Sequence, residues 1–181
     1  MNAPLAADSL NLMKFGVGQP VPRQEDPTLL RGQGRYSDDI KLEGLAYCAM
    51  VRSQVAHGLI KGIDISEART MPGVLGVWTG ADLEAAGYGT LKTVLPVPNR
   101  DGSPMKTPVR PSLATDKVRF VGDPVAFVVA ETPAQARDAA EAVMVDIESL
   151  PAVTDARAAA QPGAPLVFDD VPGNIGVDFH Y

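Results

Sequence analysis

A strand–helix–strand pattern within residues 117–153 constrains the fold of this chain more than any other feature. Residues 124–130 form a continuous apolar run rich in valine, which is typical of a strand buried on both faces. Over residues 143–148 apolar and polar side chains alternate, which predicts a second strand with Val143, Val145 and Ile147 on one face. A crossover of this length usually returns the second strand parallel to the first, so we expect a β-α-β unit.

The helix between these two strands carries its own start signal. Thr132 has the chemistry of an N-cap, Pro133 suits the first helical position, and Gln135 is placed to close a capping box. The turn over residues 130–133 has no glycine and carries an acid where a phosphate would sit, so we expect no nucleotide site here. Mostly small residues at helical spacing would let the helix lie close against a sheet: Ala136, Ala139, Ala140 and Val143.

Further elements are expected earlier in the chain. The apolar run 45–51 is predicted to be a central strand. A strand over residues 59–65 is followed by a short helix capped by Ser66. Another strand, 74–78, leads into a second short helix that begins at Thr79. Strands mixed with short helices in this order predict an α+β domain.

Two segments lack regular periodicity. Residues 88–114 are rich in proline and contain a hairpin-turn signal at Asp101–Gly102. Residues 162–181 are predicted to form an extended C-terminal segment that follows a short helix within 154–160. We expect a partner surface to cover the apolar side chains of these segments, because together they exceed what a soluble monomer exposes. They are Leu91, Val94, Leu95, Val97, Val109, Leu166, Val167, Phe168, Ile175 and Phe179.

Composition excludes several classes of protein. A 181-residue chain with 45% hydrophobic residues is long enough for one domain with a core, and its net charge of −6 disfavours nucleic acid and anionic membranes. Its apolar runs are too short to span a bilayer. One cysteine excludes an internal disulfide and a cysteine-based metal cluster. The N-terminal residues lack the pattern of a secretory signal, so a cytoplasmic location is expected.

No residue stands out as catalytic. His57 lacks companions and is interpreted as a turn histidine bonded to the backbone, and Cys48 as a small core residue, because nothing nearby would lower its pKa. The arginines in the glycine-spaced segment 31–36 are interpreted as solvated charges at a turn. Asp169 and Asp170 would point apart on an extended chain, and we expect them to stay solvated.

Several motifs nevertheless carry a specific resemblance. VRFVGDPVAFVVAET, followed by AxDAAExVxVDxExLPAV, resembles the α/β-hammerhead domain of the xanthine dehydrogenase, aldehyde oxidase and carbon monoxide dehydrogenase family. There this domain is the N-terminal part of the large, molybdopterin-binding subunit. The resemblance runs from Val17 to Asn174 and includes, in the family's order, PVPRQEDPTLLRGQGRYSDDI, VRSQVAHGLIKGIDISEARTMPGVLGVWTGADL and GAPLVFDDVPGN. In the family's R-S-P-x-A-H-A run, Gln54 here replaces the proline and Gly58 the final alanine.

The resemblance implies an aldehyde oxidase/xanthine dehydrogenase-type α/β-hammerhead with β-α-β units and long Pro/Gly-rich loops. Residues 1–18 would be a flexible arm, residues 19–161 the hammerhead domain, and residues 162–181 a linker toward the molybdopterin-binding domains. The family's pterin-gripping loops and glutamate base lie in those later domains. The resemblance therefore implies no catalytic, cofactor-binding or metal-binding residue in this chain.

Two functions stay open. By resemblance, the chain is a structural and assembly portion of a molybdenum hydroxylase, an oxidoreductase acting on an aldehyde, purine, N-heterocycle or carbon monoxide. Its partners would be the molybdopterin-binding remainder of the large subunit and the iron–sulfur and flavin subunits, with molybdenum–molybdopterin, FAD and 2Fe–2S held outside this chain. Alternatively, it is a free-standing binding or assembly module without enzyme activity. The DNA after the Tyr181 codon would distinguish the two.

Overall fold

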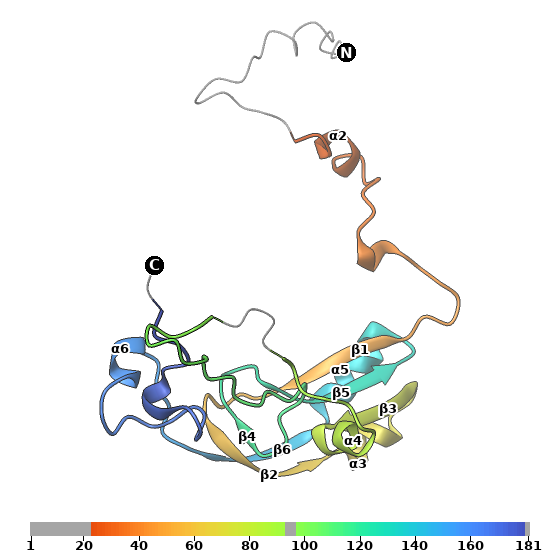
Figure 1. Cartoon of the computed structure of the whole chain (residues 1–181). Coiled ribbons are helices and arrows are strands. Elements are labelled where there is room, and N and C mark those ends of the chain that lie inside the picture. The colour runs from red at the N-terminus through yellow and green to blue at the C-terminus, as the bar shows by residue number, and fades with distance from the viewer. Residues whose placement is uncertain (1–22, 93–96, 180–181) are drawn as a thin grey trace, which may run out of the picture. The chain divides into compact units, whose positions relative to one another are not determined.

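The computed structural model describes residues 23–92 and 97–179, and the chain divides into two compact units, 1–44 and 45–181 (Figure 1). In the first unit, the described residues form one short helix, α2 (Asp26–Leu29), and a 3-10 turn, η1 (Ser37–Asp39). None of these residues is buried, so this segment has no core of its own. The arm predicted for residues 1–18 lies outside the described residues.

The second unit contains two antiparallel sheets of three strands each (Figure 1). Sheet A has the order β1 (Tyr47–Arg52), β5 (Pro124–Ala130), β3 (Val74–Thr79). Sheet B has the order β4 (Lys117–Val118), β2 (Gly58–Asp64), β6 (Met144–Ser149). These positions confirm the strands predicted from the sequence, and the mixture of strands and helices confirms the α+β class.

The predicted parallel return is wrong. β5 and β6 lie in different sheets, and every pairing within the two sheets is antiparallel. The helix between them, α5 (Pro133–Glu141), therefore carries the chain from one sheet to the other. The alternating pattern of β6 predicted correctly which side chains face inward. Val145 and Ile147 are half-buried, while Met144, Asp146 and Glu148 are exposed.

The prediction of a central first strand is also wrong. β5 is the centre of sheet A, and β1 is an edge strand that pairs only with β5 within the sheet. The two faces of β1 differ in burial although both are apolar: Val51 on one face is buried, whereas Cys48 and Met50 on the other are exposed. Cys48 is therefore not the core residue that the sequence predicted.

The helix α5 packs its alanine stripe as expected. Ala136 and Ala139 are 1% and 0% exposed, and the helix contacts β1 and β5 of sheet A. The Thr132 hydroxyl caps the helix by accepting a hydrogen bond from the Gln135 amide at 3.3 Å. It also donates to Gln135 Oε1 at 2.8 Å, so the Gln135 side chain bonds to the cap hydroxyl.

The two short helices differ in how they start. In α4 (Gly80–Ala85) the predicted start at Thr79 is confirmed, with a capping box between Thr79 and Asp82. In α3 (Ser66–Thr70) the predicted Ser66 cap is wrong. The Asp64 carboxylate instead accepts hydrogen bonds from the Ser66 amide and hydroxyl, at 2.9 and 2.6 Å.

The long loop and the C-terminal tail pair with each other. The predicted turn at Asp101–Gly102 is confirmed, since Gly102 has φ of +81° and its amide donates to Asn99 O at 2.9 Å. The Lys106 amide donates to Gly176 O at 2.8 Å and the Arg100 amide to Asp178 O at 2.9 Å. The tail includes α6 (Ala156–Ala159), as expected, and the 3-10 turn η2 (Pro172–Asn174).

This pairing buries only part of the apolar set predicted to need a partner. Half-buried are Val97, Leu166, Val167 and Phe168. Between 50% and 68% exposed are Leu91, Val109, Ile175 and Phe179. Val94 and Leu95 lie outside the described residues. Within the described ranges, no helix is long and apolar enough to cross a membrane.

Candidate functional site

His57 has a structural role. It is 7% exposed, and its Nδ1 lies 2.8 Å from the carbonyl oxygen of Pro151. Because a carbonyl only accepts, Nδ1 carries the proton of this hydrogen bond. The Leu150 amide in turn donates to the His57 carbonyl at 2.8 Å. His57 therefore fastens the turn before β2 to the end of β6, which confirms the predicted turn histidine.

An ion pair joins sheet B to the tail. Lys117 Nζ lies 2.8 Å from Asp169 Oδ2 and 3.1 Å from Oδ1. The Lys117 side chain is only 11% exposed, whereas that of Asp169 is 78% exposed. The hydrogen bond and charge of Lys117 lower the pKa of Asp169. Asp169 therefore stays exposed, as predicted, but it also pairs with Lys117, a partner that no local sequence pattern indicated.

Arg119 strengthens the same junction. Its Nη1 donates to the Lys117 carbonyl at 2.9 Å, and its guanidinium lies 4.8 Å from the centre of the Phe168 ring. The Arg119 amide donates to Asp123 Oδ2 at 2.9 Å. Arg119 Nε is buried and has no hydrogen-bond partner within the part of the chain that the structure describes. Together, Lys117 and Arg119 hold Phe168 and Asp169 against the sheet.

A cleft of about 400 Å³ opens beside this junction. We call it the loop–tail cleft; apolar residues of the long loop, the 119–124 turn and the tail wall it, including Val109, Phe120 and Phe168. Its charged lining residues are Lys106, Arg110, Arg119 and Asp123. Burial raises the pKa of Asp123. The lining is apolar and positively charged on balance, which suits an apolar partner surface that carries acidic groups.

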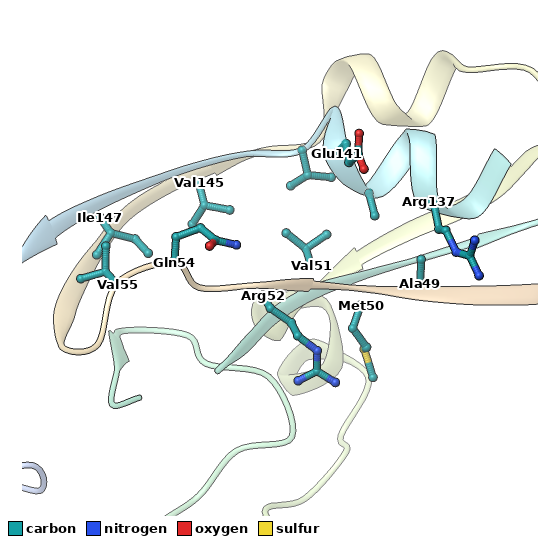
Figure 2. Close-up of a pocket in the computed structure, with 12 residues that line it drawn as sticks. Ala49, Met50, Val51, Arg52, Gln54, Val55, Arg137, Glu141, Val145 and Ile147 are labelled. Carbon is teal, nitrogen blue, oxygen red and sulfur yellow. The ribbon is translucent and has the colours of Figure 1, made fainter. Parts of the chain in front are cut away.

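A second opening lies between the two sheets. This groove, of about 630 Å³, is lined by β1 and the turn after it, by α5 and by β6. Figure 2 shows Val51 on β1 and Val145 on β6 pointing into the space between the two strands. Arg52, Arg137 and Glu141 are its charged lining residues. Among the described residues that line these two openings, no nucleophile is hydrogen-bonded to a histidine or carboxylate base.

The remaining candidates do not form a catalytic site. Cys48 lies on an edge strand, and partial burial of its thiol raises its pKa, which disfavours the reactive thiolate. Arg31 and Arg35 are exposed at a turn where Gly32 has φ of +68°. Among the residues described, no three His, Cys, Asp or Glu side chains are grouped as a metal site.

Known proteins match this chain along most of its length. Residues 31–151 match the family "aldehyde oxidase and xanthine dehydrogenase, a/b hammerhead domain". The nicotine 6-hydroxylase large subunit of Paenarthrobacter nicotinovorans is 43% identical over 163 residues, which cover 89% of this chain and 19% of that protein. The carbon monoxide dehydrogenase large chain of Afipia carboxidovorans is 40% identical over 156 residues, covering 86% of this chain and 18% of the relative.

Solved structures agree with these matches. Quinoline 2-oxidoreductase from Pseudomonas putida 86 has a TM-score of 0.68 and 40% identity, covering 86% of this chain and 19% of that one. This chain thus spans about a fifth of the length of the relatives it matches. The match over residues 31–151, together with the two antiparallel sheets and their helices, shows that the chain belongs to the aldehyde oxidase and xanthine dehydrogenase family, as its α/β-hammerhead domain.

Proposed function

We propose that this chain is the hammerhead portion of a molybdenum hydroxylase large subunit and contributes assembly surface rather than catalytic groups. One observation carries the proposal: the chain corresponds to the hammerhead domain and to 18–19% of the large subunits it resembles. By this proposal residues 19–161 are the hammerhead domain and residues 162–181 lead toward the rest of the subunit.

The described residues do not fit a molybdenum–pterin or iron–sulfur group. Cys48 stands alone on an edge strand, and no described cluster of three His, Cys, Asp or Glu side chains accompanies it. The turn between β5 and α5 has no glycine. We therefore assign molybdenum–molybdopterin to the remainder of the large subunit, and FAD and 2Fe–2S to partner subunits in the cytoplasm.

The loop–tail cleft is the surface we assign to contact with the molybdopterin-binding remainder. Its apolar wall, its excess of positive charge and the half-exposed apolar residues around it fit a protein surface better than water. Arg110→Glu reverses one charge in this lining and should weaken association with the remainder of the subunit. Arg157→Glu changes an exposed residue of α6 that does not line the cleft and is the matched control.

Metal analysis and assays test the central assignment. The chain alone should contain no molybdenum and should not oxidise aldehydes, purines, N-heterocycles or carbon monoxide. When this chain is combined with the remainder of its large subunit and the partner subunits, the complex should contain molybdenum and oxidise one of these substrates. Stoichiometric molybdenum in the chain alone would overturn the proposal. If the DNA after the Tyr181 codon encodes no molybdopterin domain, a free-standing assembly module is favoured instead.

A further inference from the structure

The hydrophobic core of the second unit is open on the side of the groove between the two sheets. At its floor Val51 and Val143 are 7% and 8% exposed, and both belong to the core cluster. Higher on the wall Val145 and Ile147 are only partly buried, although they pack against the same core. The groove beside these residues, of about 630 Å³, is therefore a space next to the core that the described residues leave unfilled.

The groove follows the free edge of β1. Four consecutive β1 residues, Ala49–Arg52, line it, although successive side chains of a strand point to opposite faces. A groove that touches every residue in turn therefore runs along the strand's edge. Among the described residues, no strand of sheet A pairs with this edge beside Ala49–Arg52, since β1 pairs only with β5. The N–H and C=O groups along such an edge are available to another strand.

This edge lacks the usual protection against pairing. Exposed edge strands are commonly guarded by charged residues or proline. β1 has no proline, and its only charged residue is Arg52 at its last position, whereas β6 at the edge of sheet B carries Asp146 and Glu148 within the strand. The difference makes the edge of β1 better suited than that of β6 to accept another strand.

The opposite wall has the spacing that an added strand requires. Val143, Val145 and Ile147 repeat every second residue and line the groove. An extended segment along β1 would place every second side chain on this wall, because both have a period of two. The charged lining residues do not select the charge of the segment, because Arg137 and Glu141 on α5 have opposite signs. Arg52 extends to the side of β1 opposite Val51, and its Nη1 donates to Gly122 O at 2.9 Å (Figure 2).

We propose that an extended segment of the molybdopterin-binding remainder of the large subunit adds to β1 as the fourth strand of sheet A. The segment carries alternate apolar side chains that fill the groove. This inference rests on the proposed function, which supplies the source of the segment. About four-fifths of the length of the related large subunits lies outside the region this chain matches, which leaves ample chain to provide it.

Amide hydrogen exchange tests the added strand. The chain is measured alone and in complex with the remainder of its large subunit. The β1 amides that β5 leaves unpaired should exchange about tenfold or more slowly in the complex. The edge amides of β3, at the other side of sheet A, serve as the internal comparison and should change little. If the complex forms and the β1 amides stay fast, the added strand is refuted while the proposed function stands; if no complex forms, both fail.

A pair of variants tests the groove wall. Val145→Lys places a charge on the wall, and the matched Met144→Lys places it at the neighbouring position on the opposite, exposed face of β6. Only Val145→Lys should weaken association, by about tenfold or more. The thermal melting of each isolated variant reports whether it is folded. Equal association of the two folded variants would contradict the proposal, as would β1 amides that are already protected in the chain alone.

Discussion

A methyl group added at Gly58 should be harmful, although the same change four residues later in the strand should not. Gly58 is buried at the start of β2, opposite Ser149 of β6. A Cβ built there would clash with the Ile147 side chain and lie 2.8 Å from the carbonyl oxygen of Glu148. At Gly62 a Cβ would meet nothing within 4 Å. Of these two glycines, only Gly58 lies where a Cβ would meet β6.

The expected free energies follow from two opposing effects. Overpacking a core contact costs about 1–3 kcal/mol. Replacing glycine with alanine also reduces the freedom of the unfolded chain, which stabilises the fold by about 0.4–1 kcal/mol. Gly58→Ala should therefore lose about 1–2 kcal/mol of unfolding free energy, because the backbone oxygen of Glu148 cannot move without disturbing β6. Gly62→Ala should be unchanged or gain up to about 1 kcal/mol.

Urea unfolding followed by tryptophan fluorescence measures both variants. Trp78 is the single tryptophan, 37% exposed and stacked on Phe127 with ring centres 5.2 Å apart, so its emission should change on unfolding. With a slope of about 2 kcal/mol per molar urea, in the middle of the range for a small protein, the midpoint of Gly58→Ala should fall by roughly 0.5–1 M. A midpoint for Gly58→Ala at or above that of Gly62→Ala would refute the close approach.

Three further results are expected. Ala139→Leu should cost about 1–3 kcal/mol because Ala139 lies on the buried face of α5, whereas Ala134→Leu on the exposed side of the helix should stay within about 0.5 kcal/mol; equal midpoints in denaturation would contradict this packing. Thr132→Ala should cost about 1 kcal/mol through the lost cap, as thermal melting would report. The pKa of Asp169 in the folded chain lies below its ordinary value of 3.8, so the stabilisation from Lys117 is present above about pH 4 and is lost as pH falls through the folded pKa. The protection factors of the tail amides, which correct for the intrinsic pH dependence of exchange, should therefore fall in acid, and Lys117→Met should remove that fall.

The sequence predicted the positions of helices and strands better than it predicted which strands pair with each other. The valine run of β5, the cap at Thr132 and the alanine stripe of α5 are local signals, and each appears in the structure where it was predicted. Strand pairing depends on contacts across the chain, and a helix of nine residues connects two sheets as readily as two strands of one sheet. The predicted parallel return failed for this reason.

The apolar run of β1 led to the wrong prediction of a central strand for a related reason. Apolarity on both faces of a strand is typical of the centre of a sheet. It also suits an edge strand that another part of a larger protein covers, and the exposed Met50 and the open groove beside it fit that case. Lys117 and Asp169 are 52 residues apart, so no local pattern could have joined them. The family resemblance, by contrast, came from motifs spread along the chain and identified the fold correctly.

Native mass spectrometry tests the central claim most directly. The chain is measured alone and after mixing or co-expression with the molybdopterin-binding remainder of its large subunit. We predict an isolated chain without molybdenum, and a one-to-one complex in which molybdenum stays with the remainder. An isolated chain that carries molybdenum, or a folded remainder that never associates with this chain, would contradict its assignment as an assembly portion of the large subunit.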